Sequence, residues 1–593
     1  MTSLHQTLTE KPTRSQWWIG LGISLVIGLV YSLPALQEAF SSPYVIQDDA
    51  RQHVFWMRRF LDPGLFPNDL MADYFQSVAP WGYTTLYRLF AMVGIDPVTF
   101  SKWLPPVLGL IVTGYSFGVA TQLLPLPIAG FAAATLLNQN LWMRDDLSSA
   151  TPGAFFYPIF LAFLYYLLRQ SLLPCLVTIA LQGLFYPQGI FLSAGLLLLR
   201  LVSWEQTTSR RRLVGRRDRL WFSAIGLGVA ALVILLYSFK SSQFGAVVRL
   251  AEARTLPAFL PGGWSAYFSD QFTEFWLCGK RSGIVPTEWC DLAKDGQDIR
   301  RPWLLLLRLP TIGLALLLPI FLALRDRLPL AQRLQPEVVI LLQGMVVSIG
   351  MFLIAHPMAF KLHLPNRYSE HSLRILFALA AGLSLVILWD QLVRWVQTQT
   401  RSTFAPLILS SLLAAGLVFY PYGLEIDNEP FPVTGYLTGK SPALYEFFAQ
   451  QPKDSVIASL TEEANQIPTF SQRSLLAGGE GYLLPYHPQY FQPLSQRLLD
   501  LLQAQYSSDL NTVKAVIQRY GIDFWLLDRE SFQPDFQNPK SYLTSLFAQF
   551  PEAQPIQTQV AAGVIPALSQ IKTCNAFQRD GFRVLRAKCI LRQ

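Results

Sequence analysis

The stretch WWIGLGISLVIGLVYSLPAL, residues 17–36, contains no charged residue and follows Lys11 and Arg14. About 20 residues, each rising about 1.5 Å, cross the hydrocarbon core of a bilayer, so this stretch predicts a transmembrane helix. A signal peptide would have a shorter apolar region, of about 7 to 15 residues, and a small-residue cleavage site. We therefore expect an uncleaved first span.

Similar apolar runs recur through the first 424 residues. We place spans near residues 17–36, 103–123, 126–141, 152–169, 172–186, 187–203, 220–238, 303–325, 336–355, 370–393 and 403–421, about eleven in all. The third to sixth are short and interrupted by prolines, which leaves the count open by two. The segment WGYTTLYRLFAMVG (81–94) contains Arg88 and predicts a helix lying at the membrane interface.

The overall composition agrees with a membrane protein. Of the 593 residues, 51% are apolar and 15% are charged, and the mean hydropathy is +0.31. A soluble globular chain carries roughly a quarter charged residues. The predicted fold class is an α-helical polytopic membrane bundle of about eleven transmembrane helices, spanning residues 1–424.

The formal charge of +8 is concentrated in short loops between the apolar runs. The most basic are 203–219, 325–333 and 394–401, which are all cytoplasmic if the N-terminus is cytoplasmic. External loops 37–102 and 240–302 and the C-terminal region then lie on the opposite side. This pattern predicts a multi-pass protein, placed by us in a bacterial inner membrane among its lipids, and gives no reason to expect nucleic-acid binding.

The cysteines agree with this predicted division into external regions and membrane spans. Cys278 and Cys290 lie in one predicted external loop, Cys574 and Cys589 lie in the C-terminal region, and Cys175 lies within a span. Two pairs on the oxidising side of a membrane suit two local disulfides, Cys278–Cys290 and Cys574–Cys589. Four free thiols are the alternative. The spacing matches no zinc-binding pattern.

The composition changes near residue 425. Apolar runs shorten to strand length, and amphipathic helical patterns lie between them. The expected strands are 455–460, 474–479 and 523–528, and the expected helices are 493–507 and 509–521, the latter ending on Gly521. Alternating strands and helices predict a soluble, non-cytoplasmic α/β domain over residues 425–593.

Two acidic pairs lie in successive predicted external loops. Asp48 and Asp49 occur in YVIQDDARQHVFWMRRF (44–60), and Asp145 and Asp146 occur in MRDDLSSATPG (143–153). Carboxylates beside a membrane surface can serve as a general base, a metal ligand or a polar anchor. If the two pairs converge, they suit a divalent cation such as Mg²⁺ or Mn²⁺, which prefers oxygen ligands. An ordinary solvated loop is the alternative.

The later segment HPMAFKLHLPNRYSEHSLR (356–374) is basic on the predicted external side, against the usual charge distribution. An anionic headgroup such as a lipid-linked phosphate would explain this exception. Contact with ordinary anionic lipid, or a salt bridge to the soluble domain, would also explain it. The candidate phosphate-binding residues are Arg367, Lys361, His363, Arg374 and, from the first loop, His53.

These features together resemble the GT-C superfamily of membrane glycosyltransferases: the first-loop Asp pair, a second acidic motif one external loop later, a basic late loop, about eleven spans and an external C-terminal domain. The resemblance implies transfer of a sugar from a polyprenyl-phosphate or pyrophosphate carrier to a glycan, lipid or protein acceptor. It implies that Asp49 or Asp48 acts on the acceptor, with Asp49 preferred, and that Arg367 and Lys361 meet the donor phosphate.

The resemblance further implies metal binding by Asp145 and Asp146, together with Asp49. The segment AGGEGYLLPYHPQYFQPLSQR (477–497) is similar to soluble domains of bacterial members, which implies that Glu480, Tyr482 and His487 face the membrane cavity. The WWDYG motif of oligosaccharyltransferases is absent, so we do not expect glycosylation of N-linked sequons. The predicted function is inverting sugar transfer on the non-cytoplasmic face, and the alternatives are a transporter for lipid-linked sugars and a non-catalytic membrane scaffold.

Overall fold

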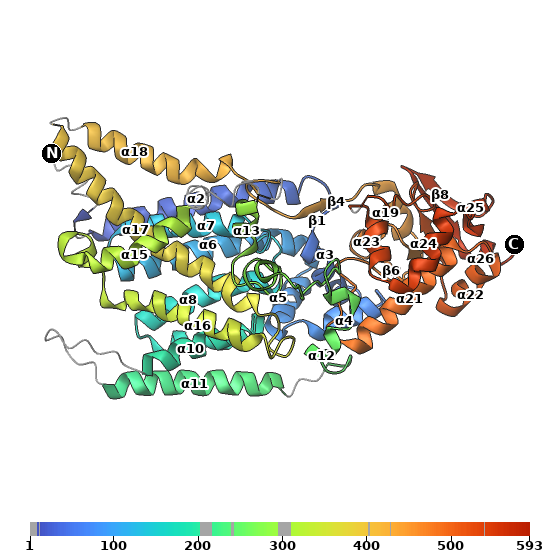
Figure 1. Ribbon diagram of the computed structural model, residues 1–593, viewed down its shortest axis with the longest axis horizontal. Coiled ribbons are helices and arrows are strands. Elements are labelled where there is room, and N and C mark those ends of the chain that lie inside the picture. Colours follow the sequence, from blue (N-terminus) through green and yellow to red (C-terminus); the bar gives the residue numbers. More distant parts are fainter. Residues whose placement is uncertain are drawn as a thin grey trace.

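The computed structural model describes residues 9–10, 12–201, 216–238, 242–294, 310–400, 404–426, 429–538 and 540–593. The molecule is elongated, with a helical bundle at one end and a domain containing the C-terminus at the other (Figure 1). The N-terminus lies at the end of the bundle farthest from that domain (Figure 1). The basic loop residues 203–215, the predicted span residues 303–309, and Arg401 and Thr403 lie outside the described residues.

Each of the eleven predicted spans overlaps one helix of the bundle. These are α2 (Arg14–Ala39), α6 (Pro97–Leu123), α7 (Pro127–Trp142), α8 (Phe156–Leu168), α9 (Leu172–Phe185), α10 (Gly189–Leu201), α11 (Arg216–Ser238), α15 (Pro310–Ala323), α16 (Val339–Ala355), α17 (Asn366–Gln399) and α18 (Phe404–Phe419). Within the described residues, six helices are long and apolar enough to cross a membrane. The chain is therefore a multi-pass membrane protein, while the number of crossings stays a prediction.

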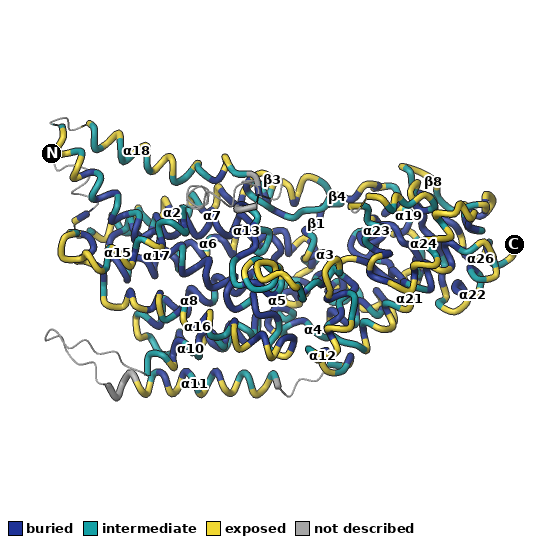
Figure 2. Tube along the Cα trace, viewed as in Figure 1, coloured by how far each residue is buried: buried dark blue, intermediate teal, exposed yellow. Residues whose placement is uncertain are grey.

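The central helix of the bundle is α17, which packs against α7, α15 and α16. Its Gly382 lies against Ala133 of α7, where an added Cβ would come within 2.5 Å of the Ala133 backbone. Small residues at such crossings let two helices approach closely in a membrane. Helices α11 and α18 lie at the periphery and are largely exposed (Figure 2). Their exposed side chains are mostly apolar, as lipid contact requires.

The C-terminal domain is built on a five-stranded sheet with the order β6-β5-β7-β9-β8. Strands β6 (Ser474–Leu475), β5 (Val456–Ser459) and β7 (Phe524–Leu527) are parallel, and they match the three predicted strands. Helices α21 (Pro488–Tyr506) and α22 (Leu510–Tyr520) match the predicted helices, and Gly521 adopts the left-handed conformation that ends α22. The sequence reading missed the antiparallel hairpin of β8 (Asn575–Arg579) and β9 (Phe582–Arg586).

A short ribbon ties the first external loop to the segment that leads into this domain. Strand β1 (Val45–Gln47) pairs antiparallel with β4 (Tyr436–Thr438), with Ile46 opposite Leu437. Helix α3 (Asp48–Val54) follows β1 directly. Residues 1–424 and 425–593 remain our predicted domains, and the ribbon crosses between them. It fixes the start of α3, and hence the first acidic pair, relative to the C-terminal domain.

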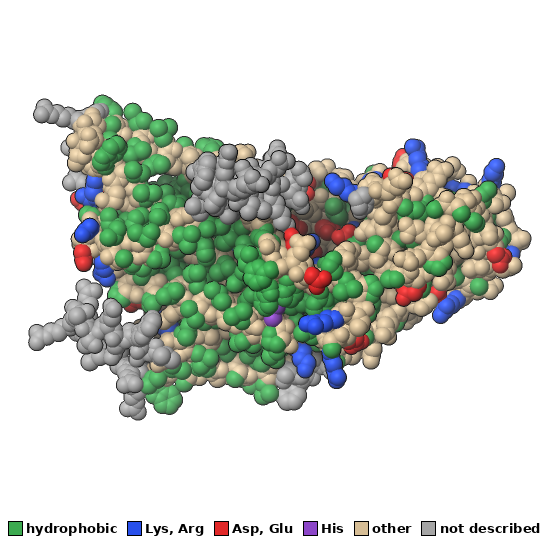
Figure 3. Space-filling view, in the orientation of Figure 1, with side chains coloured by type: hydrophobic (Ala, Val, Ile, Leu, Met, Phe, Trp, Pro, Cys, Tyr) green, Lys and Arg blue, Asp and Glu red, His purple; other side chains and the backbone are tan. Residues whose placement is uncertain are grey.

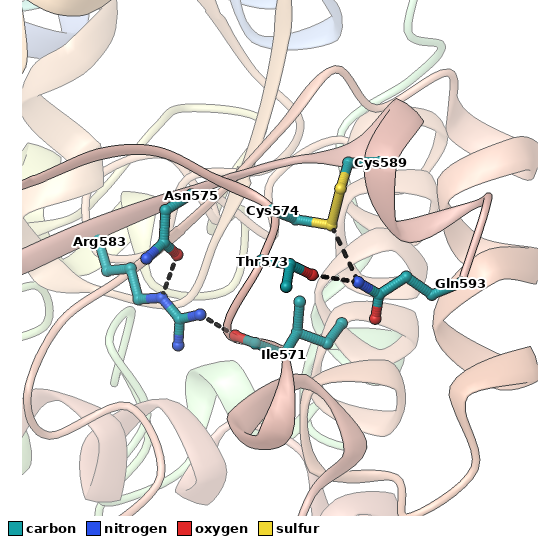
Figure 4. Close-up of a disulfide and its surroundings, with 7 residues drawn as sticks. All are labelled: Ile571, Thr573, Cys574, Asn575, Arg583, Cys589 and Gln593. Atoms are coloured by element: carbon teal, nitrogen blue, oxygen red, sulfur yellow. Dashed lines mark hydrogen bonds between the residues drawn. A yellow bond between two sulfur atoms is a disulfide. The ribbon is translucent and has the colours of Figure 1, made fainter.

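Both expected disulfides are present, and Cys175 is a buried free thiol. Cys278–Cys290 closes a loop beside the bundle. Cys574–Cys589 fastens the final residues to the residue directly before β8, and Gln593 donates a hydrogen bond toward the Cys574 sulfur at 3.5 Å (Figure 4). The second disulfide therefore secures the far end of the C-terminal domain.

Candidate active site

The first acidic pair begins a helix whose start is fixed by hydrogen bonds. Gln47 caps α3 by accepting a hydrogen bond from the Ala50 amide at 3.0 Å, and the Asp48 amide donates to the Gly435 carbonyl at 3.0 Å. Arg51 holds the Asp48 carboxylate at 2.7 Å. The Asp49 side chain reaches solvent although protein surrounds it, so it lines a recess.

The second acidic pair is brought to the same place by the segment before β4. Gln47 donates a side-chain hydrogen bond to Asp145 Oδ2 at 3.0 Å. Gly435, with φ +63°, passes so close that an added Cβ would lie 2.6 Å from the same oxygen. Only glycine combines that backbone conformation with that approach. Asp145 therefore lies beside the first acidic pair, as the sequence hypothesis required.

Asp146, unlike Asp145, belongs to a buried network of ion pairs. It accepts a hydrogen bond from Tyr157 at 2.9 Å and pairs with Arg374. Arg374 is fully buried and also binds both oxygens of Glu288, at 2.6 and 2.7 Å, and Glu370 at 2.9 Å. Three carboxylates occupy the guanidinium, so the assignment of Arg374 to a lipid phosphate is corrected: it is a structural residue.

Cations on two other elements face the acids. Arg367, near the start of α17, is 31% exposed and makes only a long contact, 3.5 Å, with Glu370. The positive charges of Arg367 and Lys280 both act on Asp49. Asn366 donates to the Lys280 carbonyl at 2.9 Å, which fixes the Lys280 loop against α17. Arg144 acts on Asp145 in the same way. The recess thus has acidic and basic walls.

Lys280 and Arg144 were missed by the sequence analysis. Each had a signal: Lys280 stands two residues after Cys278, and Arg144 directly precedes the second acidic pair. Figure 3 shows acidic and basic side chains in a hollow between the largely apolar bundle and the C-terminal domain.

The pKa values of Asp49, Asp145 and Asp146 are not all shifted in the same direction. Burial and the neighbouring Asp49 raise the pKa of Asp145 to about 7. Burial and Asp48 raise the pKa of Asp49, although Arg367 acts in the opposite direction. Burial acts to raise the pKa of Asp146, but Arg374 and three further basic groups hold it well below its usual range. Asp146 is therefore ionised, whereas Asp49 and Asp145 each hold a proton to a higher pH than an ordinary aspartate.

The remaining predicted phosphate-binding residues lie in different surroundings. Lys361 is exposed, and the His363 ring lies 6.3 Å from the Tyr486 ring. Burial, together with Arg367, lowers the pKa of His363 to about 3, so this ring is neutral. His53 packs edge-on against Phe75, and burial lowers its pKa to about 4. His53 thus contacts an aromatic ring and is neutral, and its assignment to phosphate binding stays a prediction.

The predicted cavity residues of the C-terminal domain do not line the recess as a group. Glu480 is exposed, and Tyr482 is fully buried. The Arg51 guanidinium lies over the Tyr482 ring, 5.9 Å from its centre. His487 hydrogen-bonds Tyr74 at 3.1 Å. Tyr482 and His487 therefore join the C-terminal domain to the first external loop, and Tyr482 supports the arginine that holds Asp48.

The predicted metal set of Asp49, Asp145 and Asp146 does not fit this arrangement. Among the described residues, no group of three or more His, Cys, Asp or Glu side chains is placed to hold a metal ion. Asp146 is already neutralised by Arg374. Guanidinium and ammonium groups balance the charges of Asp49, Asp145 and Asp146.

Comparison with known proteins identifies the architecture. No protein-family model and no curated protein matches the sequence. The oligosaccharyltransferase of Archaeoglobus fulgidus, tethered to an acceptor peptide with the NVT sequon, superposes with a TM-score of 0.50 and 10% identity, covering 91% of this chain and 72% of that one. The chain therefore shares the overall fold of that oligosaccharyltransferase.

A second solved structure is similar over nearly its whole length. ArnT from Cupriavidus metallidurans, in the apo state, gives a TM-score of 0.47 and 12% identity, and the match covers 97% of this chain and 98% of that one. At 10% identity the likeness to the oligosaccharyltransferase establishes the fold and no more. The function of this chain therefore has to be inferred from the residues of its own recess.

Proposed function

We propose that this protein is a membrane glycosyltransferase that moves a sugar from a polyprenyl-phosphate or pyrophosphate carrier to an acceptor on the non-cytoplasmic face. The observation that supports the proposal most directly is the electrostatic interaction of Asp49 with Arg367 and Lys280, which brings a carboxylate and two cations to one recess. A lipid-linked donor has to present a phosphate and an anomeric carbon together. Opposed acidic and basic walls suit that chemistry.

Asp49 is the proposed base. The acceptor hydroxyl loses its proton to the Asp49 carboxylate while its oxygen forms a bond to the anomeric carbon. The bond between that carbon and the phosphate oxygen breaks on the opposite side, which inverts the configuration. A carboxyl whose pKa is raised toward neutral accepts a proton more readily than an ordinary aspartate, and burial with Asp48 raises the pKa of Asp49.

The departing phosphate keeps the bonding electrons and leaves as an anion. Arg367 is the proposed principal partner for that charge, because its guanidinium is only weakly engaged by Glu370. Lys280 supports it from the loop that Asn366 fixes, and Lys361 lies nearby in the sequence as a further cation. Phosphate is already a good leaving group, so no separate general acid is required.

The test uses purified protein in liposomes with a polyprenyl-phosphate donor carrying a labelled sugar. We expect Asp48→Asn/Asp49→Asn to reduce transfer at least about a hundredfold, the usual contribution of a general base, without loss of the folded bundle. Asp270→Asn is the matched control, since it removes an exposed carboxylate of loop 240–302. Full transfer by the double variant would remove the catalytic assignment.

The same assay separates a transporter from a transferase. Movement of labelled donor across the bilayer with no sugar reaching any acceptor indicates a transporter. Related halves and charged residues at mid-membrane depth would be expected of a transporter. The apolar spans and the single C-terminal domain favour transfer.

A further inference from the structure

A second recess lies at the opposite end of the bundle from the acidic pair. A cavity of about 350 Å³ and a neighbouring one of about 680 Å³ share Pro12, Trp17, Tyr165 and Arg169 in their walls, and together they form one groove. The groove lies where α2 begins and where α6 and α8 end. The N-terminus is at this end of the molecule, away from the C-terminal domain (Figure 1).

The floor of the groove is preformed. Tyr165 lies flat on Gly118 of α6, where an added Cβ would come within 2.8 Å of the tyrosine ring. Trp17 packs edge-on against Phe117, with ring centres 5.2 Å apart. Gln122 donates toward the carbonyls of Gly118 and Tyr165, both at 3.4 Å. These contacts bind α6 and α8 together beneath the groove.

Two arginines stand at its rim. Arg169 donates a hydrogen bond to the Tyr165 hydroxyl at 2.7 Å and lies over that ring, 5.5 Å from its centre. Arg14 lines the wider part of the groove beside Trp18, which is 56% exposed. Within the described part of the chain, neither guanidinium forms an ion pair with a carboxylate. Two positive charges therefore face one aromatic-walled groove.

We propose that this groove binds the phosphate headgroup of an anionic phospholipid in the leaflet where the N-terminus lies. Arginine matches phosphate with paired N–H donors, and tryptophan and tyrosine are the side chains that settle at the headgroup level of a bilayer. The groove opens at the ends of apolar helices, so its occupant is a lipid held by its headgroup, with the acyl chains lying along the bundle. This site is separate from the proposed transfer site.

The experiment measures lipid retention by native mass spectrometry of the full-length protein released from detergent, with phosphatidylglycerol or phosphatidylcholine added. We expect the wild-type protein to retain phosphatidylglycerol and to be stabilised by it in thermal unfolding. Arg14→Gln/Arg169→Gln should weaken that binding by roughly 25-fold, because each basic residue at an anionic membrane surface contributes about a fivefold factor. Arg14→Lys/Arg169→Lys keeps both charges but not the paired N–H donors, so it should lose less binding than Arg14→Gln/Arg169→Gln.

Arg325→Gln/Arg327→Gln is the matched control, because it removes two exposed arginines of the basic loop 325–333 and leaves the groove intact. It should bind like the wild type. Equal retention of the zwitterionic lipid, or unchanged phosphatidylglycerol binding by Arg14→Gln/Arg169→Gln, would overturn the proposal. A loss in the control equal to the loss in the groove variant would also overturn it, since binding would then follow total charge.

Discussion

Asp145 lies between Arg144 and the Asp49 carboxylate, and it is hydrogen-bonded by Gln47. Burial and the like charge of Asp49 raise the pKa of Asp145 to about 7, and the pKa of Asp49 is raised as well. Because the pKa of Asp49 is raised, the proposed base loses its acceptor form at a higher pH than an ordinary aspartate does. We therefore expect the transfer rate at saturating donor to rise with pH above the ordinary aspartate range.

Asp145→Asn separates this coupling from simple loss of structure. The asparagine keeps an oxygen for Gln47 but removes a negative charge beside Asp49, so the pKa of Asp49 falls. The acidic limb of the pH–rate profile should move to lower pH, while Asp270→Asn should leave it in place. An unmoved limb in Asp145→Asn would contradict the electrostatic link between the two acids.

At the scale of elements, the loop closed by Cys278–Cys290 has a positioning role. It carries Lys280 near one end and Glu288, on α13 (Thr287–Lys294), near the other. Glu288 is 1% exposed and binds two of the three guanidinium nitrogens of the buried Arg374, so the loop is anchored inside the bundle. A buried carboxylate–guanidinium pair of this geometry fixes position more reliably than it adds stability.

The two disulfides give a matched pair of variants. They span 12 and 15 residues, so each is worth about 3 kcal/mol of unfolding free energy in the chain-entropy model. Cys278→Ser/Cys290→Ser should raise the KM for the donor roughly tenfold, about 1.4 kcal/mol, because Lys280 loses its fixed position. Cys574→Ser/Cys589→Ser should lower the Tm about as much as Cys278→Ser/Cys290→Ser does. It should leave the KM for the donor unchanged.

These outcomes distinguish positioning from stability. If both pairs of serines raise the donor KM equally, the loop acts only through global stability. If neither changes the KM although the Tm falls, Lys280 does not contact the donor. Only a KM effect confined to the loop beside the bundle agrees with the geometry.

At the scale of the whole molecule, the groove with Arg14 and the recess with Asp49 lie at opposite ends of the bundle. The positive-inside pattern predicts that the first is cytoplasmic and that the second lies on the opposite side of the membrane. Alkaline phosphatase folds only where its disulfides form, so its fusion to Gln593 should be active in cells. Alkaline phosphatase fused after Arg333, following the basic loop, should be inactive in cells. Green fluorescent protein fused at the same position should be fluorescent.

A reversed pattern for the two fusions would place the proposed transfer site in the cytoplasm. That result would exclude a donor presented on the outer face, and with it the proposed reaction as written. Activity of the phosphatase at both positions would show that the basic loop does not set the orientation.

The sequence by itself determined the features that depend on local composition. Hydropathy over about 20 residues indicated each predicted span, and a helix of the described residues overlaps every one of them, because transfer of apolar side chains into lipid is a property of each segment. Alternating strand and helix patterns located β5, β7 and α22, and cysteine positions indicated both disulfides. The acidic pairs were visible as candidates because charge is rare beside these spans.

Only the tertiary structure decided which charges meet. Arg367 and Arg374 are seven residues apart on α17, yet one faces the recess and the other is enclosed by three carboxylates. Asp145 and Asp146 are adjacent, yet only Asp146 is held by Arg374. Lys280 joins the site through a loop and a hydrogen bond from Asn366. The free energy of a charge depends on neighbours supplied by distant segments, and a linear pattern does not contain those neighbours.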